Sequence, residues 1–382
     1  MKPLSFLPLD LPPATARLRA EVRDFLHVEL AGLGPRARAR SWSAFDAEFS
    51  HKLGARGWIG MTLPRKYGGH ERSAVDRYVV LEELLAAGAP VGAHWIADRQ
   101  SGPLLLRYGS ETQRASILPG IARGATCFCI GMSEPGAGSD LAAIRTRAVP
   151  ADGGWLLNGQ KIWTTHSDKA HYMIALVRTS GDAASRQQGL SQLLIDLKTP
   201  GITIRPITDL LGERHFGEVF FQDVRLGADA LIGNEGDGWR QVTAELALER
   251  SGPERYLSSY RLFDAVLRAA GPEPDEGVAT AIGGIVADLW TLRQMSMSVA
   301  GQLAAGEEPA LEASIVKDLG NLFEQELPRI VQAMASDEMR GNTASGLTEV
   351  LEYLLQASPA FSLRGGTREI LRGIIARGLE LR

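Results

Sequence analysis

The stretch M-S-E-P-G-A-G-S-D at residues 132–140 is the most informative part of this sequence. A proline and two glycines predict a tight turn, in which backbone N–H groups can approach a planar ring or an anionic group closely. A second stretch, N-G-Q-K-I-W-T-T at residues 158–165, places a tryptophan between polar residues, where its ring is suited to covering a planar cofactor. Taken separately, each stretch also fits a simpler structure: an ordinary turn, and a tryptophan in a sheet core.

The sequence on either side of these stretches changes its periodicity twice. Residues 14–120 carry apolar side chains at helical spacing, as in Leu18, Val22 and Phe25. Between residue 125 and about residue 225, short apolar runs indicate strands instead, and helical spacing returns at about residue 236. This order predicts an α+β fold with helices and strands in separate layers or domains. The expected strands are 172–177, 190–197, 219–224 and a short one at 154–159 that runs into a turn.

Composition excludes several classes of protein. The 382 residues include 41 basic and 45 acidic ones, and the net charge of −4 offers no basic excess for binding nucleic acid. Hydrophobic residues at 45% and charged residues at 23% are typical of a soluble globular protein. At roughly 150 residues per domain, the length fits two or three domains. No window approaches 18 apolar residues and no signal peptide is recognisable, so we expect no membrane span and a cytoplasmic protein.

The two cysteines, Cys127 and Cys129, stand one residue apart. On a strand this spacing places both side chains on the same face. Two cysteines cannot form a disulfide framework, and no histidine or cysteine cluster with metal-ligand spacing surrounds them. We therefore expect small buried thiols and no metal site.

Together, the stretches 132–140 and 158–165 resemble the flavin-binding segments of the acyl-CoA dehydrogenase family. That family carries T/S-E-P-G-A-G-S-D followed by N-G-x-K-x-W-I-T; the first motif is matched in full and the second departs only at Thr164. The resemblance continues through most of the chain. Further segments that look like the family are 108–113, 118–119, 201–202, 220–224, 233–238, 313–317 and 366–370.

The resemblance implies an N-terminal helical domain at 1–122, a central β-sheet or barrel domain at 123–230 and a C-terminal four-helix bundle at 231–382. It also implies FAD, bound between these domains. Matching the family's motifs position by position places two groups of residues near the cofactor. The expected contacts are Met132, Ser133, Gly138, Ser139, Trp163 and Thr165 from the central domain, with Ser139 nearer the acyl-CoA, and Thr367 and Glu369 from the C-terminal domain.

The family's reaction removes an α-proton from a thioester, which requires a carboxylate base. One family position for this glutamate is an E-G-T motif, but here the stretch reads R-G-G-T and Gly365 stands in the glutamate's place. The other is a helix after the central domain, where Glu249 and Arg250 match the isovaleryl-CoA and long-chain members. We expect Glu249 to be the base and Arg250 its support, although a surface Glu-Arg pair is the plain alternative. Glu254 and Glu245 are the fallback carboxylates, and Pro253 is expected to kink this helix.

Two features depart from the family. Its R-x-x-F-G loop, whose arginine reaches the FAD pyrophosphate of a neighbouring subunit, is replaced at 270–277 by an acidic stretch without arginine. A later G-G-x-G-Y segment is not recognisable between 325 and 360. Either the chain pairs with a paralogous subunit that supplies these contacts, or it is a homo-oligomer that holds FAD differently. Possible local substitutes for the missing arginine are Arg261, Arg268 and Arg293.

The resemblance therefore predicts an FAD-dependent acyl-CoA dehydrogenase that produces a 2-enoyl-CoA and passes electrons to an electron-transferring flavoprotein. The rivals are a flavin oxidase or monooxygenase on the same fold, and a partner subunit with little activity of its own. A base on the helix weakly favours branched or long acyl chains over short straight ones. Two further sites stay open: His166 is read as a solvated loop histidine or a flavin neighbour, and His94 with Trp95 as acyl-pocket or core residues.

Overall fold

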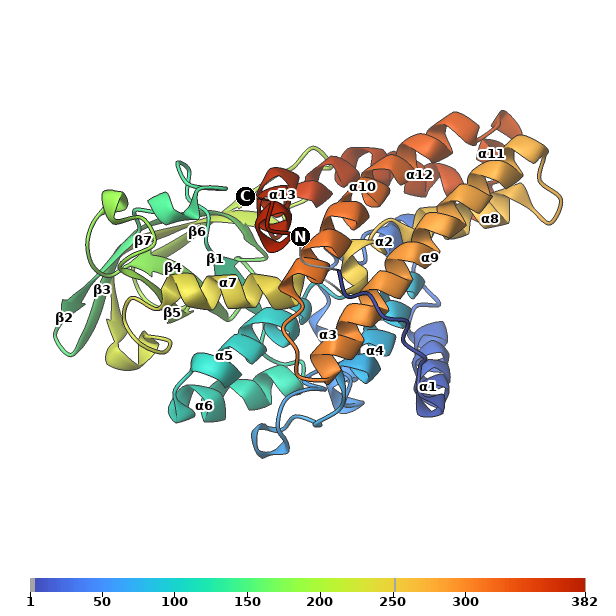
Figure 1. Ribbon diagram of the computed structural model, residues 1–382. Helices are drawn as coiled ribbons and strands as arrows, with labels where there is room; N and C mark the ends of the chain where they lie inside the picture. Colours follow the sequence, from blue (N-terminus) through green and yellow to red (C-terminus); the bar gives the residue numbers. More distant parts are fainter. Residues whose placement is uncertain (1–3, 251, 382) are drawn as a thin grey trace. The chain divides into compact units, whose positions relative to one another are not determined.

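The computed structural model describes residues 4–250 and 252–381, except for the side chains of residue 183 and residues 245–249. The described chain forms two compact units, each assembled from separate segments. The sheet unit combines residues 45–72 with 92–246. The helical unit combines the described residues among 1–44, 73–91 and 247–382. Figure 1 labels the helices and strands of both.

One mixed sheet is the centre of the sheet unit, and seven strands form it within the described residues. Their hydrogen-bonded order is β1-β4-β2-β3-β7-β6, and β5 also pairs with β4. β1 runs parallel to β4, whereas the β2–β3, β3–β7, β4–β5 and β6–β7 pairs are antiparallel. The strands are β1 (Phe128–Gly131), β2 (Arg147–Ala151), β3 (Gly154–Thr165), β4 (Tyr172–Arg178), β5 (Leu190–Asp196), β6 (Ile202–Ile207) and β7 (Phe216–Gly227).

Burial along the strands explains why these residues form a sheet. β4 is a mostly apolar run buried on both faces, as expected for a strand with neighbours on both sides. β5, which pairs with β4, is buried except at Leu194 and Asp196. β6 and β7 alternate between covered and exposed side chains, the pattern of strands with one face toward a core. The cluster beneath the sheet contains Leu157, Met173, Val177, Ile195, Val219 and Phe221.

Helices before and after the strands complete the sheet unit. α6 begins with a reciprocal cap, in which the Ser110 hydroxyl and the Gln113 side chain each bond the other's backbone N–H. The amide of Gln113 also donates to the carbonyls of Asp229 and Leu231, at 2.7 and 3.1 Å, which ties α6 to the segment after β7. The helical elements are α3 (Ala47–Ala55), a short π-helix (Ala97–Ser101), α5 (Gly102–Tyr108), α6 (Glu111–Ala122) and α7 (Gly238–Glu249), whose last residues belong to the helical unit.

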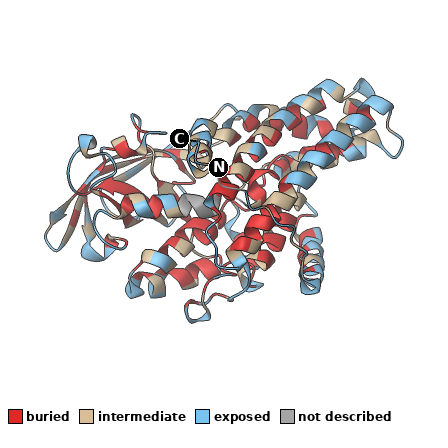
Figure 2. Ribbon diagram, viewed as in Figure 1, coloured by how far each residue is buried: buried red, intermediate tan, exposed pale blue. Residues whose placement is uncertain are grey.

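The helical unit is organised around α4, which is buried along most of its length (Figure 2). Glu82 of α4 accepts from Arg19 of α1 at 2.7 Å and from Arg293 of α9 at 2.6 Å. Tyr78 of α4 shares a hydrogen bond of 2.6 Å with Tyr256. The longer helices are α1 (Pro13–Glu29), α4 (Ala74–Ala87), α8 (Tyr260–Ala270), α9 (Glu276–Ala304), α10 (Ala310–Met334), α12 (Leu347–Ala357) and α13 (Arg368–Gly378); α2 (Pro35–Ala39) and α11 (Asp337–Gly341) are short.

The order of helices, sheet and helices confirms the predicted α+β fold. The short strand expected at 154–159 was wrong in length, because β3 continues to Thr165 through two bulges rather than turning. The kinked helix at Pro253 was also wrong: α7 ends at Glu249. The three-domain division stays a prediction. Among the described residues, no helix has the length and apolar character needed to cross a membrane.

The two thiols are placed as expected. Cys129 lies in β1 and Cys127 directly before that strand, and both are buried and free. Burial raises the pKa of the Cys127 thiol to about 11 and raises that of Cys129 further. Neither thiol carries the negative charge at neutral pH that nucleophilic or redox chemistry needs.

Candidate active site

The stretch 132–140 contains a turn that closes on itself. The N–H of Glu134 donates to the carbonyl of Ala137 and the N–H of Ala137 donates to the carbonyl of Glu134, each at 3.0 Å. Pro135 and Gly136 occupy the exposed positions between them. Proline presets its own backbone angle, and glycine leaves the outer side of the turn open, so the sequence favours this conformation.

A buried ion pair attaches this turn to β3. The Lys161 side chain is completely buried, and its Nζ donates to Glu134 Oε1 at 2.9 Å and to the carbonyl of Met132 at 3.0 Å. One residue further along β3, the N–H of Ile162 donates to the carbonyl of Ser133 at 2.9 Å. Met132, Ser133 and Glu134 are therefore each held directly by the strand.

The Glu134 carboxylate has further donors. The backbone N–H groups of Arg145 and Thr146 bind its two oxygens at 2.6 and 2.9 Å. Burial raises the pKa of Glu134, but Lys161 and these N–H groups outweigh burial and the pKa is lowered. Burial lowers the pKa of Lys161 to about 8, against the opposing effect of Glu134. Both side chains are charged at neutral pH.

Trp163 is presented by a bulge. The pairing of β3 with β7 slips between Lys161 and Thr164, and Trp163 lies at that slip with a φ of 57°. Its side chain is 57% exposed although Thr164 beside it is buried, and its ring meets Phe216 edge-on at 6.0 Å. The predicted contacts Trp163 and Thr165 thus lie on the strand that holds the turn at 132–137.

The remaining predicted residues of the stretch lie beyond the turn. Gly138 and Ser139 are exposed, and a Cβ added at Gly138 would meet nothing within 4 Å. Asp140 pairs with Arg186 at 2.6 Å on the surface. Gly138 and Ser139 are accessible to a ligand, and their contacts with the cofactor stay a prediction.

Two histidine predictions have different outcomes. His166 is not solvated, because its side chain is only 2% exposed. Its backbone N–H donates to the backbone carbonyl of His215 at 2.8 Å, and the Phe45 ring meets its ring edge-on. The prediction of His166 as a solvated loop histidine was therefore wrong, because Phe45 and His215 pack against its ring. His94 and Trp95 are both buried, and His94 Nδ1 shares a 2.8 Å hydrogen bond with Ser50.

The predicted base lies at the end of α7, in the helical unit. The side chains of Glu249 and of the fallback Glu245 lie outside the described residues. Arg250 follows α7 and is buried. Pro253 opens a short 3-10 helix, Pro253–Arg255, in which Glu254 is buried. A proline has no N–H to donate and crowds the preceding turn, which explains why α7 stops before it.

The R-G-G-T turn is attached to α10. Lys317 is completely buried, and its Nζ donates to the carbonyl of Gly366 at 2.7 Å. Arg364 donates to the buried Glu324 at 2.8 Å. Gly365 and Gly366 have φ values of 62° and 101°, which residues other than glycine rarely adopt. A Cβ added at Gly366 would be 3.8 Å from Arg250 Nη2, so this turn and the residue after α7 are neighbours.

Thr367 and Glu369 begin α13. Thr367 precedes the first helical residue, and Glu369 is exposed in the first turn. Hydrogen bonds from its own backbone N–H and from Thr367 lower the pKa of Glu369. Lys317 and Glu324, which hold the preceding turn, were missed by the sequence analysis. The sequence could have indicated them, because each is a charged residue among the apolar positions of a helical pattern. A charged residue on the buried side of a helix requires a partner.

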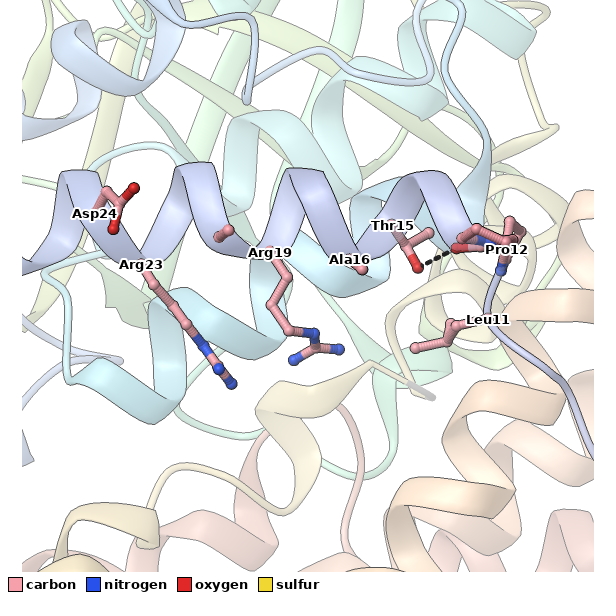
Figure 3. Close-up of a pocket in the computed structure, with 9 residues that line it drawn as sticks. Leu11, Pro12, Thr15, Ala16, Arg19, Arg23 and Asp24 are labelled. Atoms are coloured by element: carbon pink, nitrogen blue, oxygen red, sulfur yellow. Dashed lines mark hydrogen bonds between the residues drawn. The ribbon is translucent and has the colours of Figure 1, made fainter.

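A surface hollow of about 410 Å³ lies along α1 (Figure 3), and none of the predicted site residues lines it. Arg19 and Arg23 line it, and both pair with Glu83 of α4. Its two arginines are therefore already paired with a carboxylate, and the hollow is not a candidate site.

Comparison with protein families shows whether the stretches 132–140 and 158–165 are family motifs or an ordinary turn and strand. The N-terminal domain model of the acyl-CoA dehydrogenases matches residues 12–125 and the middle domain model matches residues 129–224. The chain belongs to the acyl-CoA dehydrogenase family. Members of this FAD-dependent family dehydrogenate acyl-CoA thioesters, so the family and the enzyme class predicted from the motifs are confirmed.

Individual relatives cover nearly the whole chain. The acyl-CoA dehydrogenase IpdE1 of Mycobacterium tuberculosis is 33% identical over 376 residues, which are 94% of this chain and 95% of IpdE1. Among solved structures, the Tcur3481-Tcur3483 steroid acyl-CoA dehydrogenase has a TM-score of 0.87 at 27% identity and covers 98% of this chain and 99% of its own. The ChsE4-ChsE5 complex from Mycobacterium tuberculosis has a TM-score of 0.82 at 28% identity, with 97% and 98% covered.

The residues of the sheet unit fit the flavin of this family. Trp163 presents more than half of its indole to the outside, on a strand whose neighbouring residues hold an ordered turn. The outer side of that turn is open, since a Cβ at Gly136 would meet nothing within 4 Å. A flat apolar ring beside accessible backbone is what an isoalloxazine ring requires.

The arginines considered as substitutes for the missing pyrophosphate contact are engaged elsewhere. Arg261 pairs with Asp264 at 2.7 Å, and Arg268 binds the same carboxylate. Arg293 pairs with Glu82 at 2.6 Å. Each guanidinium therefore already has a carboxylate partner within its own unit.

Proposed function

We propose that this chain catalyses FAD-dependent α,β-dehydrogenation of an acyl-CoA to a 2-enoyl-CoA. Family membership supports the reaction class, and the turn at 132–137 held against β3 is the structural observation that supports flavin binding. Met132, Ser133, Gly138, Ser139, Trp163 and Thr165 would hold the cofactor from the sheet unit, and Thr367 and Glu369 from the helical unit. When bound, FAD accepts the hydride that leaves the β-carbon.

Glu249 is proposed as the base that takes the α-proton. Its backbone ends α7, and Arg250, next in sequence, lies near the R-G-G-T turn. That turn has glycine where other family members carry their glutamate, so it supplies no carboxylate. Arg250 would stabilise the charged form of Glu249 and would keep it ionised in a site from which water is excluded.

The test of the proposed reaction is an anaerobic titration with acyl-CoA thioesters. The expected result is loss of the oxidised flavin absorbance, with one 2-enoyl-CoA formed per flavin reduced. Absence of reduction by every straight, branched and ring-bearing acyl-CoA would contradict the proposal. Rapid reoxidation by O₂ with hydrogen peroxide release would favour the oxidase rival instead.

The acyl group is proposed to be bulky. The solved relative with a TM-score of 0.87 is described as a steroid enzyme, and another relative is an isovaleryl-CoA dehydrogenase from Pongo abelii. In this chain Gly365 brings no side chain into the space where other family members carry a glutamate. A branched or ring-bearing acyl chain makes better use of that space than a short straight one.

We also propose that the chain works with a paralogous subunit and reduces an electron-transferring flavoprotein. Two of the similar solved structures, Tcur3481-Tcur3483 and the ChsE4-ChsE5 complex, are each named for two proteins. The acidic stretch at 270–277 and the engaged Arg261, Arg268 and Arg293 support a partner that supplies the missing cation. A homo-oligomer, or a partner subunit with little activity alone, is the alternative.

A further inference from the structure

Lys161 and Glu134 form an ion pair that is withdrawn from water almost completely. Lys161 is 0% exposed and Glu134 is 8% exposed. A buried pair gains little net stability, because the loss of hydration of both charges offsets their attraction; well-packed apolar residues are often as stable. Stability alone therefore gives no reason for charged residues at these two positions.

The geometry gives another reason, because every bond of the pair acts on the turn. Lys161 Nζ bridges the Met132 carbonyl and the Glu134 carboxylate, at 3.0 and 2.9 Å. The second carboxylate oxygen of Glu134 accepts from the N–H of Arg145, on the far side of the stretch. Met132 before the turn, Glu134 at its first position and Arg145 after it are thus all bound to this one ion pair.

That point lies two residues from Trp163 on the same strand. Lys161 has the side chain that holds Met132, and Trp163 lies at the slip in pairing that follows Lys161. A change at Lys161 therefore moves the turn and the tryptophan relative to each other. These are the two parts of the sheet unit that fit a planar ring.

We propose that Lys161 and Glu134 are positioning residues whose buried ion pair holds the turn at 132–137 and Trp163 in the arrangement that receives the flavin ring, and so sets the affinity for the cofactor. This inference rests on the proposed function, since it takes the ligand to be FAD. It assigns Lys161 and Glu134 no contact with the substrate and no part in the chemical step.

The charge of Lys161 gives the inference a pH signature. Burial lowers the pKa of Lys161 to about 8, so the ammonium is present at pH 7 and mostly absent at pH 9. Beyond the pair itself, the described residues include one more charged side chain that interacts electrostatically with Glu134, Arg178 of β4, and burial lowers the pKa of Arg178. Loss of the ammonium removes the bridge to Met132, so FAD affinity falls as the pH rises through about 8.

Global stability responds to the same titration in the opposite direction. Between about pH 8 and the ordinary lysine value of 10.5, the unfolded chain binds more protons at this residue than the folded chain. The free energy of unfolding therefore gains from Lys161 as the pH rises, while flavin affinity declines. A purely structural role would not produce opposite trends.

The experiment measures FAD binding to the full chain, in the assembly in which it binds FAD, for wild type, Lys161→Met, Glu134→Gln and the double variant. Asp152→Asn is the matched control, because Asp152 lies in the same unit outside both motifs and loses only an exposed pair with Arg225. The readouts are the FAD dissociation constant from pH 6.5 to 9.5 and the thermal midpoint of the flavin-free protein.

The expected result is a dissociation constant about ten-fold or more higher in both single variants, with less than a two-fold change in the control. The double variant regains thermal stability, because neither charge is left alone, but not affinity. Lys161→Met also removes the pH dependence near 8. Wild-type affinity in the double variant, or an unchanged pH profile in Lys161→Met, would overturn the inference while leaving the proposed function intact. Failure of the wild type to bind FAD would overturn the proposed function itself.

Discussion

Single residues explain why the second motif has its composition, beginning with the glycine of its N-G-x-K start. Gly159 lies at a bulge in β3 with a φ of 143°. A Cβ there would be 2.6 Å from the hydroxyl and 2.7 Å from the Cα of Thr146. The motif requires glycine because Thr146, directly before β2, lies too close for any side chain.

Gly159→Ala is predicted to lower the free energy of unfolding by about 2 kcal/mol or more, from steric overlap with backbone that cannot move away. Chemical denaturation measures this change. Gly136→Ala is the control, since its Cβ would be in open space, and it should stay within about 0.5 kcal/mol of wild type. Equal stability of Gly159→Ala and wild type would contradict the described bulge.

Lys317 gives a second prediction at this scale. Lys317→Met removes the donor to the Gly366 carbonyl and should cost about 1–3 kcal/mol, because a part-buried carbonyl loses a charged partner. The exposed Lys198→Met should change stability by less than about 0.5 kcal/mol. Comparison of the two denaturation midpoints tests this, and similar midpoints would show that the bond to Gly366 is unimportant.

Residue patterns predicted part of the site. The motifs identified Trp163 and the turn at 132–140 because glycine, proline and an indole in fixed order have few structural uses. They did not indicate the Lys161–Glu134 pair or the Lys317 contact, because both join residues that are far apart in sequence. A pairing of this kind has no local signal.

At the scale of elements, the main differences from expectation are at the ends of helices and strands. β3 was expected to stop near residue 159 because Asn-Gly is typical of a turn. Instead the pair lies at a bulge, and the partner strand β7 continues beside it. Pairing with a long neighbour overrode the local preference. Before Pro253 the local preference prevails instead. Proline cannot continue a helix, and α7 ends at Glu249.

The contact between α1, α4 and α9 gives a prediction for elements. Glu82→Gln should cost about 3 kcal/mol, because Arg19 and Arg293 lose their shared buried carboxylate. Glu21→Gln breaks an exposed pair on α1 with Arg17 and should cost less than about 1 kcal/mol. Denaturant unfolding of both variants measures the difference, and similar losses would contradict a buried network.

At the scale of the whole molecule, sequence periodicity predicted the order of helices, sheet and helices. It could not predict that residues 45–72 belong with the sheet unit while residues 73–91 belong with the helical unit. Both segments have a similar helical character. Their assignment depends on packing between distant segments, which no short stretch encodes.

Assembly is the prediction that belongs to this scale. The chain expressed alone is expected to retain FAD at well below one equivalent, because it lacks the arginine loop that completes the cofactor site in the family. Co-expression with a paralogous acyl-CoA dehydrogenase subunit should restore full occupancy and a heteromer, measured by absorbance and light scattering. A fully yellow homo-oligomer from the single chain would contradict this prediction.

The central claim is that the base is on α7 rather than in the R-G-G-T turn. It is tested most directly by anaerobic stopped-flow reduction of the enzyme by its acyl-CoA, comparing Glu249→Gln with Glu254→Gln and Glu245→Gln. We expect Glu249→Gln to slow flavin reduction at least about 10³-fold while acyl-CoA binding changes little, since a missing base removes only the proton-transfer step. Reduction at the wild-type rate in Glu249→Gln, or loss of reduction only in Glu254→Gln or Glu245→Gln, would contradict the account.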